Sequence, residues 1–268
     1  MRRIVTTDKK GRKKLVNVPS YDNIYVNNQM GQPAYDVGIS SNGDGLPAPL
    51  LFLSPENYVG SGTTWPDVSG NGYDATLYNS PTYNGNYFNF SNTGIQYADL
   101  PNLGDLSQWT FDVWFRITAN LNTKEATSVL TTVYDDGTNY GTINFCLASD
   151  ISAGAYNSKL AVGLFDGAAW HQNVGFTPTL NTWYNVVGTY DGSTISQYIN
   201  GTLNDSLSYS GTSSSNGAPV RIARRWDGPL NTIHFFPGDV GIVKVYNESL
   251  NIDQVNTLFQ ENRTTYGI

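Results

Sequence analysis

The chain of 268 residues contains one cysteine, two histidines and two methionines, and charged residues make up only 14% of it. The single cysteine, Cys146, excludes a disulfide bond within the chain and a metal cluster held by several cysteines. Its place in an alternating apolar segment predicts a small buried residue on a strand. The sequence also lacks a run of about 18 apolar residues, so we expect no membrane-spanning helix.

Glycine and tyrosine are plentiful, with 27 and 18 residues, and this composition favours turns and half-buried strands over solvated helices. The sequence therefore predicts an all-β fold, a two-sheet jelly-roll sandwich with one short C-terminal helix. The helix is expected over 249–259, where apolar residues recur at helical spacing and either Ser249 or Asn251 provides the cap. Strand-like runs separated by turn residues lie at 50–53, 75–77, 87–90, 110–117, 128–133, 142–148, 159–165, 169–174, 183–190, 194–199, 219–223 and 238–246.

The clearest local signal is a β-hairpin over residues 183–202. Two runs of alternating aromatic and β-branched residues flank Asp191-Gly192, and the second run closes on Asn200-Gly201. Both pairs contain residues that tolerate positive φ, as tight hairpin connections require. These two turns are therefore predicted to be scaffold rather than binding site.

Charge is unevenly distributed along the chain. The segment 2–14 has seven basic residues and one acidic residue, a net charge of about +6, which leaves about −13 on the remainder. We therefore divide the chain into a basic N-terminal anchoring arm and linker, 1–49, and a body, 50–268. Short strands are expected near 14–18 and 23–26. The proposed anchoring residues are Arg2, Arg3, Lys9, Lys10, Arg12, Lys13 and Lys14.

The charge pattern also limits the partners of the protein. An acidic body makes nucleic acid an unlikely main ligand, whereas the arm suits an acidic surface, a packaged polyanion or the body of a neighbouring copy. A disordered solubilising terminus is the alternative for the arm. The N-terminal residues lack the apolar stretch of a secretory signal, so we expect any export to use another route.

Four segments of the body, in order, resemble the concanavalin A-like lectin/glucanase superfamily, and specifically its laminin G-like jelly-roll branch. They are WPDVSGNGYDAT at 65–76, WTFDVWFR at 109–116, the hairpin at 183–202, and FPGDVGIVKVYNESL at 236–250. The resemblance covers about residues 50–260, and the first 49 residues lie outside it. It implies a jelly-roll sandwich that serves mainly in ligand binding.

The resemblance also implies a Ca²⁺ site, because relatives bind this oxygen-seeking cation between the first element and the closing strand. Asp67 and Asn71 match the first half of that arrangement. Gly241 and Ile242 stand where relatives commonly carry Asp-Glu, which leaves Asp239 two residues early but on the same face of a strand. The alternative is that Asp67 and Asn71 only stabilise a tight turn through bonds to the backbone.

Catalysis is not expected. Glycosidases of this superfamily need two carboxylates close together on one strand face. The four glutamates, Glu56, Glu125, Glu248 and Glu261, have no carboxylate partner at such a spacing on a central strand. The two histidines belong to no recognisable metal or nucleophile motif, and no phosphate-binding loop is present.

Sugar-binding jelly rolls use aromatic platforms beside polar groups, because a pyranose has an apolar face and a polar rim. Trp109, Trp114 and Trp183 have the pattern of core residues, whereas Trp170 and Trp226 lie near predicted loops. We therefore predict ligand binding by Trp170, His171, Arg224, Arg225, Trp226 and Asp227. For each loop tryptophan, covering the edge of the core is the alternative.

From these features we expect a non-catalytic virion structural protein, a capsid decoration or fibre of a phage. The body would be displayed at the virion surface for host-glycan contact. The arm would dock to other virion or capsid proteins, or to other copies in a homo-oligomer. Two alternatives stay open: a bacterial polysaccharide-binding or adhesion module that is extracellular or at the cell surface, and a purely architectural shell protein without a ligand.

Overall fold

The computed structural model describes residues 2–7, 13–18, 45–91, 95–119, 127–131, 143–150, 155–166, 169–211, 219–224 and 235–268. The chain divides into two compact units, Met1–Ala48 and Pro49–Ile268. In the first unit, β1 (Arg2–Thr7) and β2 (Lys13–Val18) pair in antiparallel fashion. The strand expected near 23–26 lies outside the described residues, as do Lys9, Lys10 and Arg12.

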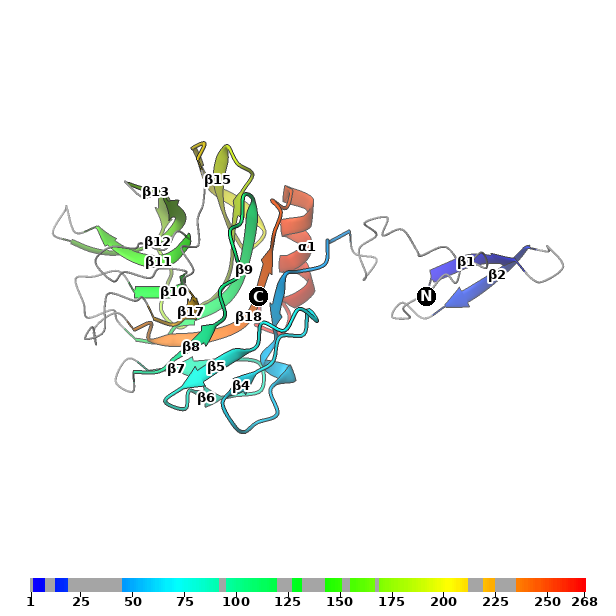
Figure 1. The fold of residues 1–268 in the computed structure, drawn as a ribbon, viewed down its shortest axis with the longest axis horizontal. Coiled ribbons are helices and arrows are strands. Elements are labelled where there is room, and N and C mark those ends of the chain that lie inside the picture. Colours follow the sequence, from blue (N-terminus) through cyan, green and yellow to red (C-terminus); the bar gives the residue numbers. More distant parts are fainter. Residues whose placement is uncertain are drawn as a thin grey trace. The chain divides into compact units, whose positions relative to one another are not determined.

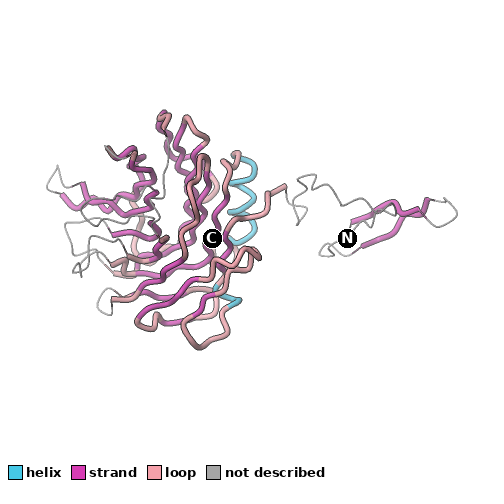
Figure 2. The backbone as a smooth tube through the Cα atoms, in the orientation of Figure 1, coloured by secondary structure: helices cyan, strands magenta, loops and turns pink. Residues whose placement is uncertain are grey.

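The second unit is a sandwich of two antiparallel sheets, as Figures 1 and 2 show. Sheet 1 runs in the order β13 (Trp170–Phe176), β12 (Ala155–Phe165), β11 (Ile143–Asp150), β10 (Thr127–Thr131), β17 (Val220–Ile222), β8 (Tyr97–Leu100), β5 (Ala75–Tyr78) and β4 (Thr64–Trp65). Sheet 2 runs in the order β16 (Thr202–Ser208), β15 (Thr194–Ile199), β14 (Trp183–Tyr190), β9 (Trp109–Ile117), β18 (Gly238–Tyr246), β7 (Phe88–Phe90) and β6 (Thr82–Tyr83), with β3 (Leu51–Leu53) also paired to β18. The predicted jelly-roll sandwich is confirmed.

The main core fills the space between the two sheets. Strand β9 supplies Trp109, Phe111 and Phe115 to it, all almost fully buried. Because successive side chains of a strand point to opposite faces, the intervening residues of β9 face away from this core. Trp65, which opens the first family-like segment, is also a core residue, with none of its surface exposed. Cys146 lies in β11, as expected, but its side chain is outside the described part of the structure.

The helix α1 (Ile252–Asn262) covers the outer face of sheet 2 beside β9 and β18 (Figure 1). Asn251 caps it: its side chain accepts bonds from the amides of Asp253 and Gln254, and the Gln254 side chain accepts from the Asn251 amide. Beneath the helix, a second apolar cluster contains Trp114, Trp183, Ile242, Phe259 and Tyr266. The expected helix and cap are confirmed, and no helix among the described residues has the length and apolar character needed to cross a bilayer.

The predicted hairpin is formed by β14 and β15, whose bounds agree with the expected strands. Gly192 has φ 93° in the first turn, and Asn200 and Gly201 have φ 50° and 76° in the second. Asp191 fixes the first turn by accepting bonds from the amides of Ser193 and Thr194. Both turns therefore serve as scaffold.

Asp112 is the most unusual polar residue under α1, because its side chain is fully buried. Its Oδ1 accepts a 2.6 Å hydrogen bond from the Asn185 amide group. Lys244 lies opposite it on β18 and binds Glu261 of α1 at 3.0 Å. Burial raises the pKa of Asp112 from 3.8 to about 6, and the charge of Lys244 and the bond from Asn185 offset only part of that rise.

The raised pKa predicts how stability changes with pH. The folded state favours the protonated Asp112 carboxyl. Its contribution to the free energy of unfolding is therefore fully present below the unfolded pKa of 3.8 and is lost as pH rises through about 6. Asp112→Asn keeps the size of the side chain and removes its ionisation. We expect the variant to be more stable than wild type at pH 8, by up to about 3 kcal/mol, and nearly equal at pH 4.

Urea unfolding at the two pH values measures this difference, and Asp253→Asn at the exposed start of α1 is the control. A loss of stability in Asp112→Asn at pH 8 would contradict the assignment.

Candidate functional site

The outer face of sheet 1 gathers aromatic and charged side chains on neighbouring strands. In β5, β8 and β17 the core takes alternate residues, among them Leu77, Ala98 and Val220. The residues between them face outward. In register, Tyr78 is opposite Tyr97, and Asp99 is opposite Arg221. We call the set Tyr78, Tyr97, Asp99, Arg221 and Arg224 the tyrosine–arginine face.

The rings of this face form a ladder. Tyr78 and Tyr97 stack with centroids 4.6 Å apart and planes within 8°. Arg224 continues the ladder, with its guanidinium carbon 4.9 Å from the Tyr97 centroid and 5.0 Å from that of Phe235. Tyr78 is 39% exposed, so it is the solvent end of the stack. The arrangement therefore presents one aromatic ring that is held firmly from behind.

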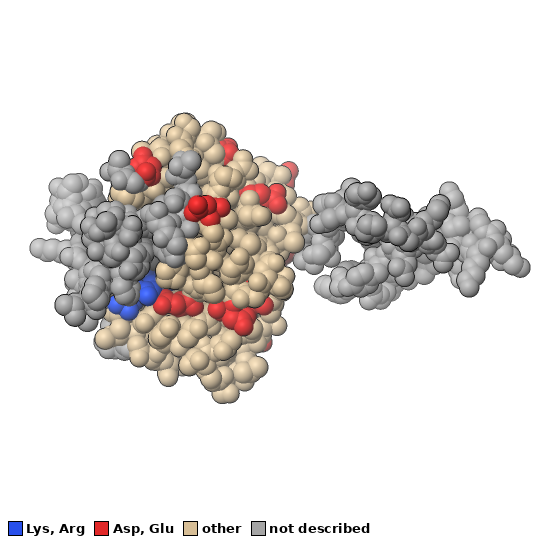
Figure 3. All heavy atoms as spheres, in the orientation of Figure 1, with Lys and Arg blue, Asp and Glu red and all other residues tan. Residues whose placement is uncertain are grey.

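Charge on this face is concentrated beside the rings. Arg221 donates two hydrogen bonds to Asp99, at 2.6 and 3.0 Å, in the bidentate geometry that suits a carboxylate. Burial and the charge of Asp99 raise the pKa of Tyr97, which keeps that phenol neutral. Burial and the neighbouring Arg221 lower the pKa of Arg224. In Figure 3, basic atoms on the described surface gather in a small area next to acidic atoms.

A second group, the β13 edge cluster, consists of Asp166, His171 and Tyr209 where the edges of the two sheets meet. His171 Nε2 lies 2.7 Å from Asp166 Oδ2, and the Tyr209 hydroxyl donates to the same oxygen at 3.2 Å. The imidazole stacks on the Tyr209 ring with centroids 3.7 Å apart. Burial and Asp166 raise the pKa of Tyr209. Because His171 belongs to sheet 1 and Tyr209 follows β16 of sheet 2, this cluster ties the two sheets together.

The structure separates the residues that sequence patterns had grouped. Trp170 and His171 are neighbours on β13 and so point to opposite faces, and Trp170 packs against Phe165 at 5.2 Å on the outer face of sheet 1. Arg224 belongs to the tyrosine–arginine face. Three further predicted ligand residues lie outside the described residues: Arg225, Trp226 and Asp227. Sequence patterns do not identify Tyr78, Tyr97, Asp99 and Arg221 as site residues, because their short strands show no clear period and come together only through sheet register.

The residues expected to bind Ca²⁺ do not fit the ion. Asp67 Oδ1 accepts bonds from the amides of Phe52 and Ser69, and Oδ2 accepts from the Ser69 hydroxyl and the Tyr73 amide, all at 2.8–3.0 Å. A carboxylate has about four lone-pair positions, and these four bonds use them. Burial alone would raise the pKa of Asp67, but the bonds from the three amides lower it.

The other two residues of that set are also occupied elsewhere. The Asn71 side chain donates to the Leu50 carbonyl at 2.9 Å, which stabilises the same turn as Asp67. Asp239 accepts bonds from Arg116 and Asn89, both at 2.7 Å. Since Phe52 pairs with a residue five positions beyond Asp239 on β18, the two carboxylates lie roughly 16 Å apart along the strand. Among the described residues no three metal-binding side chains converge.

The glutamates are spread over separate elements. Glu56 lies in the short 3-10 helix η1 (Pro55–Asn57), Glu248 follows β18, and Glu261 lies in α1. Glu125 is outside the described residues. No described glutamate therefore stands on a strand, where a glycosidase of this architecture would need its carboxylate pair.

Comparison with known families agrees with the fold. The family model described as the concanavalin A-like lectin/glucanases superfamily matches residues 89–256. The family resemblance is thereby confirmed, and three of its four sequence segments lie within the matched range; the segment 65–76 lies outside it. Comparison with curated proteins finds no match.

Several solved structures share this fold at low sequence identity. The binding domain of Paraclostridial Mosquitocidal Protein 1 has a TM-score of 0.59 and 14% identity, covering 80% of this chain and 52% of that one. The ligand binding domain of botulinum neurotoxin serotype D, in complex with N-acetylneuraminic acid, has 0.59 and 15%, covering 80% and 51%. Domain 4 of AbnA, a GH43 extracellular arabinanase from Geobacillus stearothermophilus, in complex with arabinotriose, has 0.57 and 16%, covering 79% and 98%. The chain spans about half the length of the two toxin domains.

The Asp67 turn yields a prediction about metal and stability. Asp67→Asn replaces one acceptor oxygen by an NH₂ group, which faces donors and leaves them unpaired, so we expect a loss of about 1–3 kcal/mol. Asp74→Asn in the same turn affects one exposed bond, to the Asp67 amide, and should cost less. Melting temperatures with millimolar CaCl₂ and with EDTA should be equal for wild type. Stabilisation by CaCl₂ that disappears in Asp67→Asn would contradict the turn assignment.

Proposed function

The chain belongs to the concanavalin A-like lectin/glucanases superfamily, and on this basis we propose that its second unit, Pro49–Ile268, is a non-catalytic carbohydrate-binding domain. The observation that carries the proposal is the exposed ring of Tyr78 on the tyrosine–arginine face. A sugar ring places its apolar side on such an aromatic platform and turns its hydroxyls to nearby polar groups. Stacking on Tyr97 orders the platform before the ligand arrives, which reduces the entropy cost of binding.

The charges beside the platform favour an acidic glycan. Arg221 and Arg224 bring two guanidinium groups to a face that carries one carboxylate, Asp99, while the body as a whole is acidic. Guanidinium groups bind carboxylates through paired hydrogen bonds and are more weakly hydrated than ammonium groups. One structural neighbour, the botulinum neurotoxin serotype D domain, is in complex with N-acetylneuraminic acid, and the AbnA domain is in complex with arabinotriose. These complexes support a sugar ligand by analogy of fold.

Trp170 supplies a second candidate platform on the same outer face. It lies on β13, six strand intervals from β5, which carries Tyr78, so the two platforms are separated by roughly 29 Å. An extended oligosaccharide fits this spacing better than a single sugar does. His171 is assigned a structural role and not a ligand-binding one, because it interacts with Asp166 and Tyr209 where the edges of the two sheets meet.

Binding without turnover is supported by the positions of the acidic groups. A glycosidase needs an acid and a second carboxylate on opposite sides of the scissile bond. On the tyrosine–arginine face, Asp99 is held by two nitrogens of Arg221, Nε and Nη2, so its charge is committed to a structural pair. None of the three described glutamates lies on a strand, and each belongs to a different segment.

We further propose that the domain is displayed on a virion, as a capsid decoration or fibre protein, with its basic arm bound to capsid proteins or to other copies of the chain. The support is the contrast between an arm of about +6 and a body of about −13. The arm also contains the β1–β2 hairpin. A two-stranded hairpin alone is marginally stable in water, so a binding partner would stabilise it. A bacterial adhesion module and an architectural shell protein without ligand are the rival assignments.

Substitution of the platform tests carbohydrate binding. We expect Tyr78→Ala to weaken binding on a glycan array by about tenfold, or about 1.4 kcal/mol, because the stacking surface is lost. Tyr78→Phe keeps the ring and should bind nearly as well as wild type. Both variants should melt close to wild type, since Tyr78 is at the solvent end of the ladder. Unchanged binding by Tyr78→Ala would refute the site, and no bound glycan at all would favour the architectural rival.

Deletion of residues 1–14 tests the arm. The truncated chain should fail to enter particles, while the circular dichroism spectrum and melting temperature of the body stay the same. Replacing the seven basic residues of the arm by glutamine should have the same effect, because the proposed contact is electrostatic. Normal incorporation of the truncated chain, or absence of the full-length chain from purified particles, would count against the virion assignment.

A further inference from the structure

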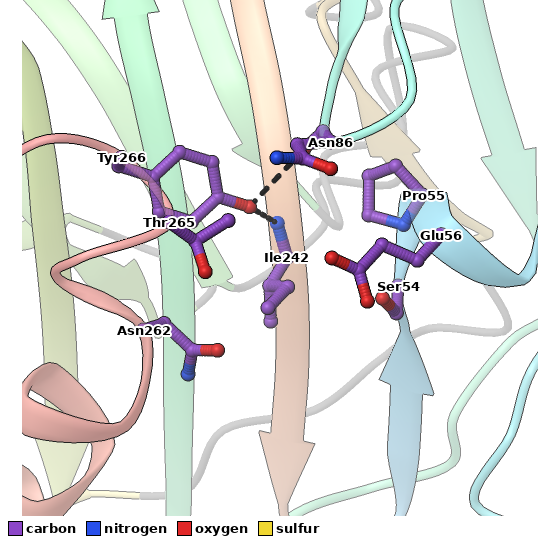
Figure 4. Close-up of a pocket in the computed structure, with 8 residues that line it drawn as sticks. All are labelled: Ser54, Pro55, Glu56, Asn86, Ile242, Asn262, Thr265 and Tyr266. Atoms are coloured by element: carbon purple, nitrogen blue, oxygen red, sulfur yellow. Dashed lines mark hydrogen bonds between the residues drawn. The ribbon is translucent and has the colours of Figure 1, made fainter.

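A small pocket lies beside the end of α1, on the side of the body covered by the helix (Figure 4). Its volume is about 80 Å³, and its walls come from four separate segments: η1 with the residue before it, the turn before β7, Ile242 of β18, and the end of α1 with the residues that follow. Figure 4 shows the side chains of Glu56, Asn262 and Thr265 directed toward the space between these segments. The pocket is therefore lined by polar groups that converge from distant parts of the sequence.

The floor of the pocket is rigid. The Tyr266 hydroxyl accepts a 2.9 Å bond from the Ile242 amide and donates a 3.2 Å bond to the Asn86 carbonyl. Burial raises the pKa of the Tyr266 phenol well above its ordinary value, so the phenol stays neutral and keeps this bonding pattern. Tyr266 also stacks on Trp114 with centroids 4.5 Å apart. The side chains around the pocket are thus attached to a fixed base.

The electrostatics of the pocket favour a cation. Glu56 is the one charged residue in its lining, and this carboxylate has no ion-pair partner within the described part of the chain. The pocket adjoins the C-terminal end of α1, whose last turn has no basic residue. The C-terminal end of a helix carries partial negative charge. Two independent sources of negative potential therefore act on the same small space.

The nearby cations are engaged elsewhere. Lys244 binds Glu261 at 3.0 Å and lies 4.9 Å from the Phe52 ring. Arg263 follows α1 and turns back toward it, with a nitrogen 3.5 Å from Gln260 Oε1 and its guanidinium carbon 5.8 Å from the Phe259 ring. Neither side chain lines the pocket. The space is left for a positive group from outside the body.

We propose that this pocket binds a primary ammonium group. The volume equals roughly that of two to three water molecules, which suits an ammonium and one or two methylene groups. An ammonium has three N–H donors. The Glu56 carboxylate, the Asn262 amide oxygen and the Thr265 hydroxyl are acceptors that can receive them. The group belongs either to a small free amine, such as an amino sugar, or to a lysine side chain of a partner protein.

Titration of the full chain with n-butylammonium chloride, followed by amide NMR, tests the site. We expect saturable shifts at residues 54–57, 242 and 262–268 with millimolar affinity, and no such shifts with n-butanol, which has the same shape without the charge. Glu56→Gln should weaken binding about tenfold, because hydrogen bonds to a charged group are the stronger ones. Glu248→Gln removes an exposed charge outside the pocket lining and should bind like wild type.

Glucosamine and Nα-acetyl-lysine amide distinguish the two sources. Tighter binding of glucosamine assigns the pocket to an amino sugar, and tighter binding of the lysine derivative assigns it to a partner protein. Equal shifts with n-butanol, or unchanged affinity in Glu56→Gln, would overturn the proposal. The outcome is independent of carbohydrate binding at Tyr78, which is on the outer face of the other sheet and is measured with glycans.

Discussion

Strand β9 carries large side chains on both of its faces, so it is stable only where both faces are covered. Its inward residues pack between the two sheets, and Trp114 packs outward against Phe259 and Tyr266. Burial of each such aromatic side chain is worth about 1.5–3 kcal/mol or more. Helix α1 is therefore part of the core structure, and its capping by Asn251 fixes where it begins over sheet 2.

Because α1 covers the outer face of sheet 2, most of that face is not available to a ligand. The layer beneath α1 contains aromatic rings and the Asp112, Lys244 and Glu261 charges, and a small pocket lies at the helix end. The described outer face of sheet 1 carries no such helix, and the Tyr78 ring is exposed there, with Arg224 half-buried and Arg221 buried beside it. The two-sided burial of β9 thus commits most of the outer face of sheet 2 to packing under α1, whereas Tyr78 on the outer face of sheet 1 stays exposed.

Sequence patterns predicted the long elements well and the site only in part. Alternation and turn residues were sufficient to predict the strands β9, β14, β15 and β18. Burial favours apolar residue types on these strands, and the turns after β14 and β15 need residues that tolerate positive φ. The short strands β4, β6 and β8 and the exposed β16 were missed, because two to four residues show no period and an exposed strand has no apolar face. The stacking of Tyr78 on Tyr97 depends on the register between β5 and β8, two strands that are neighbours in the sheet but not consecutive in the sequence. Local sequence identifies Asp67 as a turn residue or a metal ligand, and only its four hydrogen bonds decide between them.

The central claim is that carbohydrate binds at the tyrosine–arginine face. The most direct measurement is amide and side-chain NMR mapping of the full chain with a glycan identified from an array. The account predicts that the largest shifts fall on Tyr78, Tyr97, Asp99 and Arg221, with residues of α1 unaffected. Shifts confined to α1 and sheet 2, or a bound glycan that leaves Tyr78 unchanged, would contradict it.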